Sequence, residues 1–300
     1  MRGRNGERGI GEVIAVLAAV GVIAAGITFT YARTPLDELY NVSNEGLRGG
    51  WSRALVFLNY SAALVAIPAA VIVAARLGGR RAALAGLAAV GLCAVVFWPG
   101  VVEQSDLDAR SVNAIAATGV LLTTVLAIDA WRRFGGSFAP RRSLDPARLV
   151  LAALLLLLAV PWLAAMVGVS FAGVPVLGSA WQTDELRLQP GHDMPSPAVH
   201  AGHHHGLDGV LLALSALALS RMRVARLRVA VGAYLALMLA YGLANAVQDA
   251  WLEQVVKRGW TSREIPSLIL PKASLGWAAI VLAAVAIFAV GATEKARSRR

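Results

Sequence analysis

The stretch that decides the fold is RLVLAALLLLLAVPWLAAMVGV, which runs from Arg148 to Val169. Its only charged side chain is Arg148, at the start, and a helix of this length rises about 1.5 Å per residue, enough to cross roughly 30 Å of hydrocarbon. Similar apolar stretches recur along the chain, in which 57% of the residues are hydrophobic and 15% are charged. This composition excludes an ordinary soluble protein and predicts an all-α, polytopic membrane helix bundle.

The apolar stretches predict about eight transmembrane helices. Seven of them have both ends set by the sequence, at Ile10–Tyr31, Leu55–Ala75, Ala82–Val102, Ser111–Trp131, Arg148–Val169, Val229–Asp249 and Ser274–Thr293. The sixth in order begins in a histidine-rich stretch and ends at Arg221. Residues 1–300 are therefore expected to form a single integral membrane domain, within which residues 170–205 form an extracytoplasmic loop that contains histidines.

The distribution of charge predicts the orientation of these helices. With the N-terminus in the cytoplasm, nineteen of the 28 Lys and Arg residues fall on the cytoplasmic side, against five of the 18 Asp and Glu residues. Cytoplasmic loops of membrane proteins carry such an excess of Lys and Arg. Both termini are therefore expected in the cytoplasm. The preference for Arg over Lys, together with much Ala, Val and Leu, is typical of a GC-rich bacterial genome, so the expected location is the bacterial plasma membrane.

Composition also excludes several functions. The single cysteine, Cys93, rules out an internal disulfide framework and a thiolate metal cluster. The net charge of +10 comes from short clusters of Lys and Arg between apolar stretches, so it encodes topology and predicts no nucleic-acid partner. The expected partners are the lipid bilayer and either another membrane protein or further copies of the chain. No catalytic signature identifies a reaction.

All five histidines fall within fourteen residues, from His192 to His205. If the sixth helix begins near Val199, then His200, His204 and Asp208 are spaced i, i+4, i+8 and share one face, with His203 at its margin. Neutral imidazole suits zinc and copper, and a carboxylate can complete the ligand set. The sequence therefore predicts a zinc or copper site near the outer membrane surface. The alternative is a hydrated helix start without a ligand, where Asp208 complements the helix dipole.

Two asparagines lie at a depth comparable to that of Asp208. Asn59 is seventeen residues from Arg76, and Asn245 is seventeen residues from Arg228. A pocket made by Asn59, Asp208 and Asn245 would bind a substrate, although these amides can equally form interhelical hydrogen bonds that only hold the bundle together.

The leading hypothesis is an inner-membrane protein that uses the metal site for metal handling or for metal-dependent chemistry on a membrane substrate. The alternatives are a proton-coupled small-molecule transporter and a non-catalytic subunit of a membrane complex. The spacing of His200 and His204 is similar to that of the paired histidines in seven-helix intramembrane zinc hydrolases. That resemblance covers these two residues alone and implies no shared activity.

Overall fold

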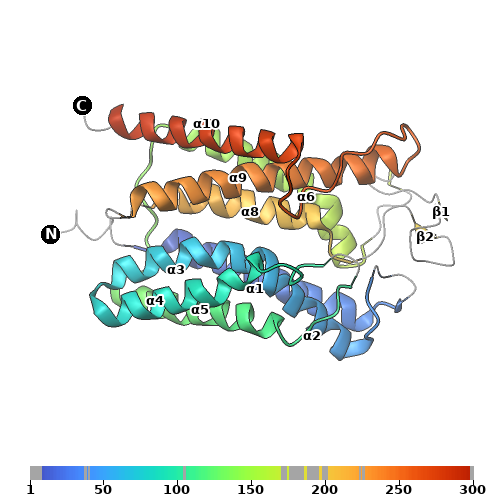
Figure 1. Cartoon of the computed structure of the whole chain (residues 1–300), viewed down its shortest axis with the longest axis horizontal. Coiled ribbons are helices and arrows are strands. Elements are labelled where there is room, and N and C mark those ends of the chain that lie inside the picture. The colour runs from blue at the N-terminus through green and yellow to red at the C-terminus, as the bar shows by residue number, and fades with distance from the viewer. Residues whose placement is uncertain are drawn as a thin grey trace.

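The computed structural model describes residues 9–36, 39, 41–103, 106–169, 174–175, 186–187, 196–197, 202–222, 224 and 227–297. These residues form a bundle of helices with a two-stranded antiparallel ribbon at one end, made by β1 (Leu186–Arg187) and β2 (Ser196–Pro197) (Figure 1). The fold is thus helical, as the composition predicts.

Seven helices of the described part are long and apolar enough to cross a membrane. They are α1 (Gly11–Arg33), α2 with α3 (Gly46–Phe57 and Ala63–Leu77, joined by a π-helical segment, Leu58–Ala62), α4 (Gly79–Cys93, continued by a 3-10 turn, Ala94–Phe97), α5 (Asn113–Phe134), α6 (Asp145–Met166), α9 (Arg228–Trp251, continued by a π-helical segment, Leu252–Val256) and α10 (Leu275–Arg297). Their length and composition make the chain a multi-pass membrane protein.

The sixth predicted helix is shorter than expected and lies deep in the bundle. Helix α8 (His205–Leu219) has 15 residues, about 22 Å of helix, and packs mainly on α9 and α6. It begins at His205 because His204 has an extended backbone, with φ −98° and ψ 147°. The expected start near Val199 is therefore wrong. His204 and Asp208 do not share a helical face, because His204 lies outside the helix.

The second helix also differs from its prediction, because it begins at Gly46 and not at Leu55. Arg53 interrupts the apolar pattern there. In the structure Arg53 is buried, and its guanidinium lies 5.8 Å from the centroid of the Tyr31 ring. Since an arginine above an aromatic face is stabilised by a cation–π interaction, the helix can continue through this position.

The chain alternates between the two ends of the bundle, so that both termini lie at the same end (Figure 1). A cluster of charged groups connects the helices at this end of the bundle. The guanidinium of Arg221, just after α8, lies 3.5 Å from Glu12 Oε1 of α1 and 3.3 Å from Asp145 Oδ2 of α6. Glu12 also accepts a hydrogen bond from the backbone N–H of Ala139 at 2.8 Å. Three helices and the loop between α5 and α6 are thereby joined.

At the opposite end, Asp108 connects the segment before α5 to the start of α2. Its carboxylate accepts hydrogen bonds from the backbone N–H of Ser43 at 2.9 Å and from the Ser52 hydroxyl at 3.4 Å. Partial burial acts to raise the pKa of Asp108, but these hydrogen bonds and one from Asn44 outweigh it, so the pKa lies below its ordinary value.

Helices α8 and α9 touch backbone to backbone. A Cβ atom placed on Gly209 would lie 2.6 Å from the carbonyl oxygen of Gly242, and one placed on Gly242 would lie 2.6 Å from the carbonyl oxygen of Gly209. Small residues permit such close crossings of membrane helices. This crossing places the first turns of α8 against the second half of α9, which carries several buried polar side chains.

Candidate functional site

Three consecutive histidines, residues 203–205, stand at the start of α8, and each faces a carboxylate from a different position in the fold. His203 faces Asp208 of α8, His204 faces Glu253 after α9, and His205 faces Asp249 of α9. All three carboxylates are buried, with at most 5% of the residue exposed. Because buried charges are costly unless they are paired, hydrogen-bonded or bound to a metal, each of these contacts needs an explanation.

His204, Asp249 and Glu253 form the group best suited to hold a metal ion. Each offers one ligand atom, and the three atoms lie within 4.8 Å of one another. Glu253 Oε1 lies 3.9 Å from His204 Nδ1 and 2.7 Å from Lys257 Nζ. The other oxygen, Glu253 Oε2, is buried and has no hydrogen-bond partner among the residues that the structure describes. A cation placed between these three residues would give this oxygen the partner that it lacks.

Asp249 belongs to this group and also contacts the start of α8. Its Oδ2 accepts a hydrogen bond from the backbone N–H of Gly206 at 2.9 Å, which is one of the four N–H groups that a helix start leaves without an internal partner. A Cβ atom on residue 206 would lie 2.4 Å from this oxygen and 2.3 Å from the Trp162 ring, so only glycine permits the approach. Asp249 thus fixes the position of α8 relative to α9.

His205 has both ring nitrogens engaged. Its Nε2 lies 2.7 Å from Gln248 Oε1, and its Nδ1 lies 3.2 Å from Asp249 Oδ1. The Gln248 amide is oriented by its own N–H, which donates to the carbonyl oxygen of Ile265 at 3.0 Å. Since both ring nitrogens of His205 face oxygen acceptors, neither is left for a metal. His205 therefore orients Asp249 and is not itself a ligand candidate.

His203 and Asp208 form a second buried pair on the other side of α8. His203 Nε2 lies 2.8 Å from Asp208 Oδ1, and the imidazole ring stands edge-on to Phe57, with 5.4 Å between the ring centroids. The backbone N–H of His203 donates to the Tyr31 hydroxyl at 3.1 Å. Because Asp208 also lies in the first turn of α8, it complements the helix dipole there.

Several buried polar atoms around this pair have no hydrogen-bond partner among the described residues. They are His203 Nδ1, Asn59 Oδ1 and Asn245 Oδ1. Buried polar atoms in native proteins are almost always paired with protein groups, water or a ligand. Their concentration at one depth of the bundle indicates a place that takes up water or a polar ligand.

Both π-helical segments of the described chain carry polar residues of these two clusters, one near the His203–Asp208 pair and one in the group of His204, Asp249 and Glu253. Leu58–Ala62 carries Asn59 and Ser61, and Leu252–Val256 carries Glu253. A π-helical turn shifts the following side chains around the helix axis, and such turns are frequent at functional sites. The helix that follows Asp249 therefore presents Glu253 to the bundle interior.

The candidate residues predicted from the sequence are separated by the structure into two sets. His204 belongs to the three-residue group, whereas His203 and Asp208 pair with each other. His200 lies outside the described residues, as do His192 and most of the 170–205 loop. Asn59 and Asn245 are buried near the same depth, but neither forms a hydrogen bond to Asp208. Asn245 instead donates to the carbonyl oxygen of Tyr241 at 2.9 Å.

Asp249 and Glu253 are metal-ligand candidates that the sequence does not predict. Asp249 marks the expected end of the seventh helix, and Glu253 falls in what looks like a solvated loop. A usable signal is present, because Asp249, Glu253 and Lys257 are spaced four residues apart and would share a face if the helix continued. The apolar pattern does not reveal that continuation.

The chemistry of the group favours divalent transition metals. One imidazole and two carboxylates are nitrogen and oxygen ligands of the kind that bind Zn²⁺ and Cu²⁺, and no cysteine joins them within the described part of the chain. Three protein ligands leave a coordination position open for water or substrate. The chain matches no family model, no curated protein and no solved structure.

Proposed function

We propose that the chain is a bacterial inner-membrane protein that binds a zinc or copper ion near its outer surface, for metal handling or for metal-dependent chemistry on a membrane substrate. The ligands in this proposal are His204, Asp249 and Glu253. The observation that supports it best is the convergence of three buried ligand atoms within 4.8 Å. One of them belongs to a carboxylate whose other oxygen has no hydrogen-bond partner in the described part of the chain. In the same proposal α8 is an eighth membrane crossing, and both termini are cytoplasmic.

The charge of the group supports a cation as its ligand. With neutral His204, the two carboxylates and the Lys257 ammonium carry a net charge of −1, and both carboxylates are buried. A divalent cation outweighs this negative charge and binds each carboxylate directly. The alternative, a purely structural ion-pair network, leaves Glu253 Oε2 without a partner among the described residues.

Metal analysis of the purified protein tests the proposal. Protein extracted in mild detergent and washed free of loose ions is expected to retain close to one equivalent of zinc or copper per chain. After treatment with a chelator, it should take up one equivalent again. Occupancy should fall under acid conditions because protons compete for imidazole and carboxylate. A metal-free protein that binds neither Zn²⁺ nor Cu²⁺ after the chelator is removed would refute the proposal.

Replacing Lys257 by Gln separates a metal site from a structural ion pair. Lys257 Nζ lies 2.7 Å from Glu253 Oε1 and therefore competes with a cation for that oxygen. Without the ammonium group, the affinity for Zn²⁺ should rise at least about tenfold, or about 1.4 kcal/mol. The reason is that two positive charges a few ångströms apart repel each other by a few kcal/mol at an effective dielectric constant near 20. Arg258→Gln is the matched control, because the Arg258 side chain instead contacts Gln254 at 3.0 Å. Weaker binding in Lys257→Gln would contradict the assignment.

The proposed orientation is tested by cysteine labelling in a Cys93→Ala background. Ser143 and Ser262 are exposed, the first in the segment between α5 and α6 and the second in the segment between α9 and α10. These two segments lie at opposite ends of the bundle (Figure 1). A cysteine at position 143 should resist an impermeant thiol reagent in intact cells, whereas a cysteine at position 262 should react. Both should react after the cells are broken. The opposite pattern in intact cells would place the termini outside.

A second candidate function is a proton-coupled transporter built on Asp208. It is favoured by the buried His203–Asp208 pair and by the unpartnered amide oxygens of Asn59 and Asn245 in its neighbourhood. An ionisable residue inside the membrane is a common element of proton pathways. Uptake driven by a proton gradient, lost in Asp208→Asn while the metal content stays unchanged, would favour this function over the first.

A further inference from the structure

A large apolar cavity lies at the end of the bundle that carries the termini, far from the histidines. Its volume is about 1170 Å³, and its walls come from the first turns of α6, the end of α8, the first half of α9 and the last half of α10. Drug-sized ligands generally occupy pockets of roughly 300–1,000 Å³. This cavity is larger, which favours a long, flexible occupant.

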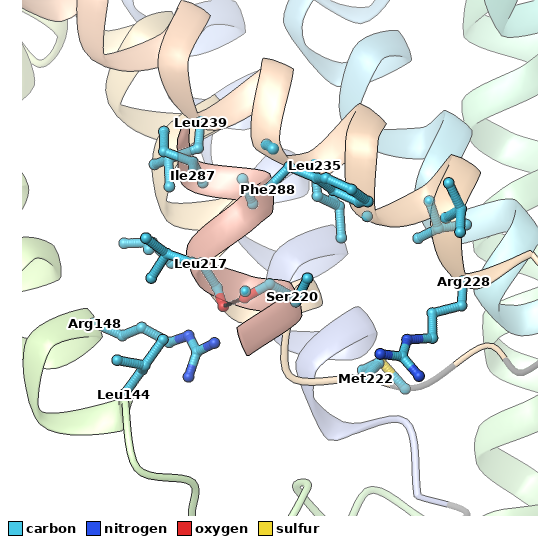
Figure 2. Close-up of a pocket in the computed structure, with 18 of the residues that line it drawn as sticks. Leu144, Arg148, Leu217, Ser220, Met222, Arg228, Leu235, Leu239, Ile287 and Phe288 are labelled. Atoms are coloured by element: carbon cyan, nitrogen blue, oxygen red, sulfur yellow. Dashed lines mark hydrogen bonds between the residues drawn. The ribbon is translucent and has the colours of Figure 1, made fainter. Parts of the chain in front are cut away.

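The polar side chains of the lining are few and stand at the opening. They are Arg148, Ser220 and Arg228; the other described side chains of the lining are apolar. Figure 2 shows the two arginines on opposite sides of the cavity, with Leu239 and Ile287 among the apolar residues farther from them. An occupant must therefore combine an anionic group at one end with a long hydrocarbon part.

The two arginines differ in how their charge is compensated. Arg148 Nη1 lies 2.9 Å from Asp145 Oδ1, so a carboxylate already balances this guanidinium. Arg228 has no carboxylate within ion-pair distance in the part of the chain that the structure describes. Its charge faces an opening in which an anion would be its natural counter-ion.

The cavity lies between α6 and α10, which are not packed against each other in the described part of the chain. Helix α6 packs on α8 and α10 packs on α9, while α6 and α10 share little contact among the described residues. Both α6 and α10 expose large apolar side chains on their outer faces, such as Leu154 and Leu282. In a membrane those faces meet lipid, so the space between α6 and α10 is accessible from the bilayer.

We infer that this cavity binds an anionic phospholipid, with an acyl chain between α6 and α10 and the phosphate against Arg228. Basic pockets between membrane helices on the cytoplasmic side bind anionic headgroups in this way. A small hydrophilic metabolite would meet an apolar wall, and a second copy of the chain would bring its own arginines to the opening. A lipid satisfies both the charge at the opening and the apolar interior.

Native mass spectrometry of delipidated protein tests this inference with defined probes. These are phosphatidylglycerol, phosphatidylcholine with the same acyl chains, and inorganic phosphate. Wild-type protein should retain one phosphatidylglycerol per chain and bind it at least about fivefold more tightly than phosphatidylcholine. Arg228→Gln should remove that preference, whereas Arg132→Gln, which removes an exposed charge on α5 at the same end, should keep it.

A second pair of variants tests whether an acyl chain occupies the apolar part of the cavity. Ala286 lines the cavity, whereas Ala283 is exposed on the same helix and does not. Ala286→Trp should weaken binding of both phospholipids, and Ala283→Trp should weaken neither. Unfolding temperatures in detergent without lipid confirm that the variants are folded.

Three outcomes would overturn the inference. The first is equal affinity of the wild type for the two phospholipids. The second is displacement of phosphatidylglycerol by inorganic phosphate alone, which would indicate a site for a small anion. The third is a dimer that persists without lipid and dissociates in Ala286→Trp, which would make the cavity an interface between two copies.

Discussion

Replacing His204 by Ala is expected to reduce the zinc or copper bound to the purified protein to less than about one-tenth of the wild-type content. His204 supplies the only imidazole of the proposed ligand set, and its loss leaves two carboxylates that also contact Lys257 and Gly206. Loss of even an outer partner of a metal ligand commonly costs 10–100-fold in affinity, so loss of a ligand should cost at least that much. Metal analysis after size-exclusion chromatography measures the effect.

Glu253→Gln should act in the same direction with less disturbance, because the amide keeps the volume of the carboxylate and removes its charge. The control is His192→Ala, which alters a histidine that lies in the preceding loop of the sequence. If all single histidine variants lose a similar small fraction of metal, the ion is held by a non-specific histidine-rich tract. That result would remove the main support for the proposed centre.

Gly209→Ala is expected to destabilise the folded protein by about 1–3 kcal/mol, as insertion of a methyl group into a close-packed interface generally does. The new Cβ would lie 2.6 Å from the carbonyl oxygen of Gly242, and backbone cannot move aside as a side chain can. Helices α8 and α9 would have to separate. Because His204 precedes α8 and Asp249 belongs to α9, the separation should also reduce metal binding.

Gly91→Ala is the matched control for this prediction. Gly91 lies within α4, and a Cβ atom there would have no neighbour within 4 Å. Alanine favours the helix by up to about 1 kcal/mol relative to glycine, so this variant should be as stable as the wild type or slightly more so. Thermal unfolding in detergent compares the two variants. Equal unfolding temperatures would show that the α8–α9 crossing is not as close as described.

Seven of the predicted membrane helices follow from the apolar stretches, within a few residues at most ends. The third is an exception at its end: it stops at Phe97 and not at the expected Val102, because Pro99 and Gly100 do not continue a helix. Asp129 and Arg133 form the local ion pair that their spacing predicts, at 2.8 Å. Such features depend on residues close together in the sequence, and local pattern is sufficient to find them.

The sequence alone determined that the chain is a multi-pass helical membrane protein and that His203, His204, His205 and Asp208 stand close to one helix start. The tertiary structure alone decided which carboxylate each histidine meets. That choice depends on where α8 begins, on the glycine contact between α8 and α9, and on the continuation of α9 to Glu253. All three are set by packing between segments more than thirty residues apart, and the hydrophobic pattern of one segment carries no information about its partner.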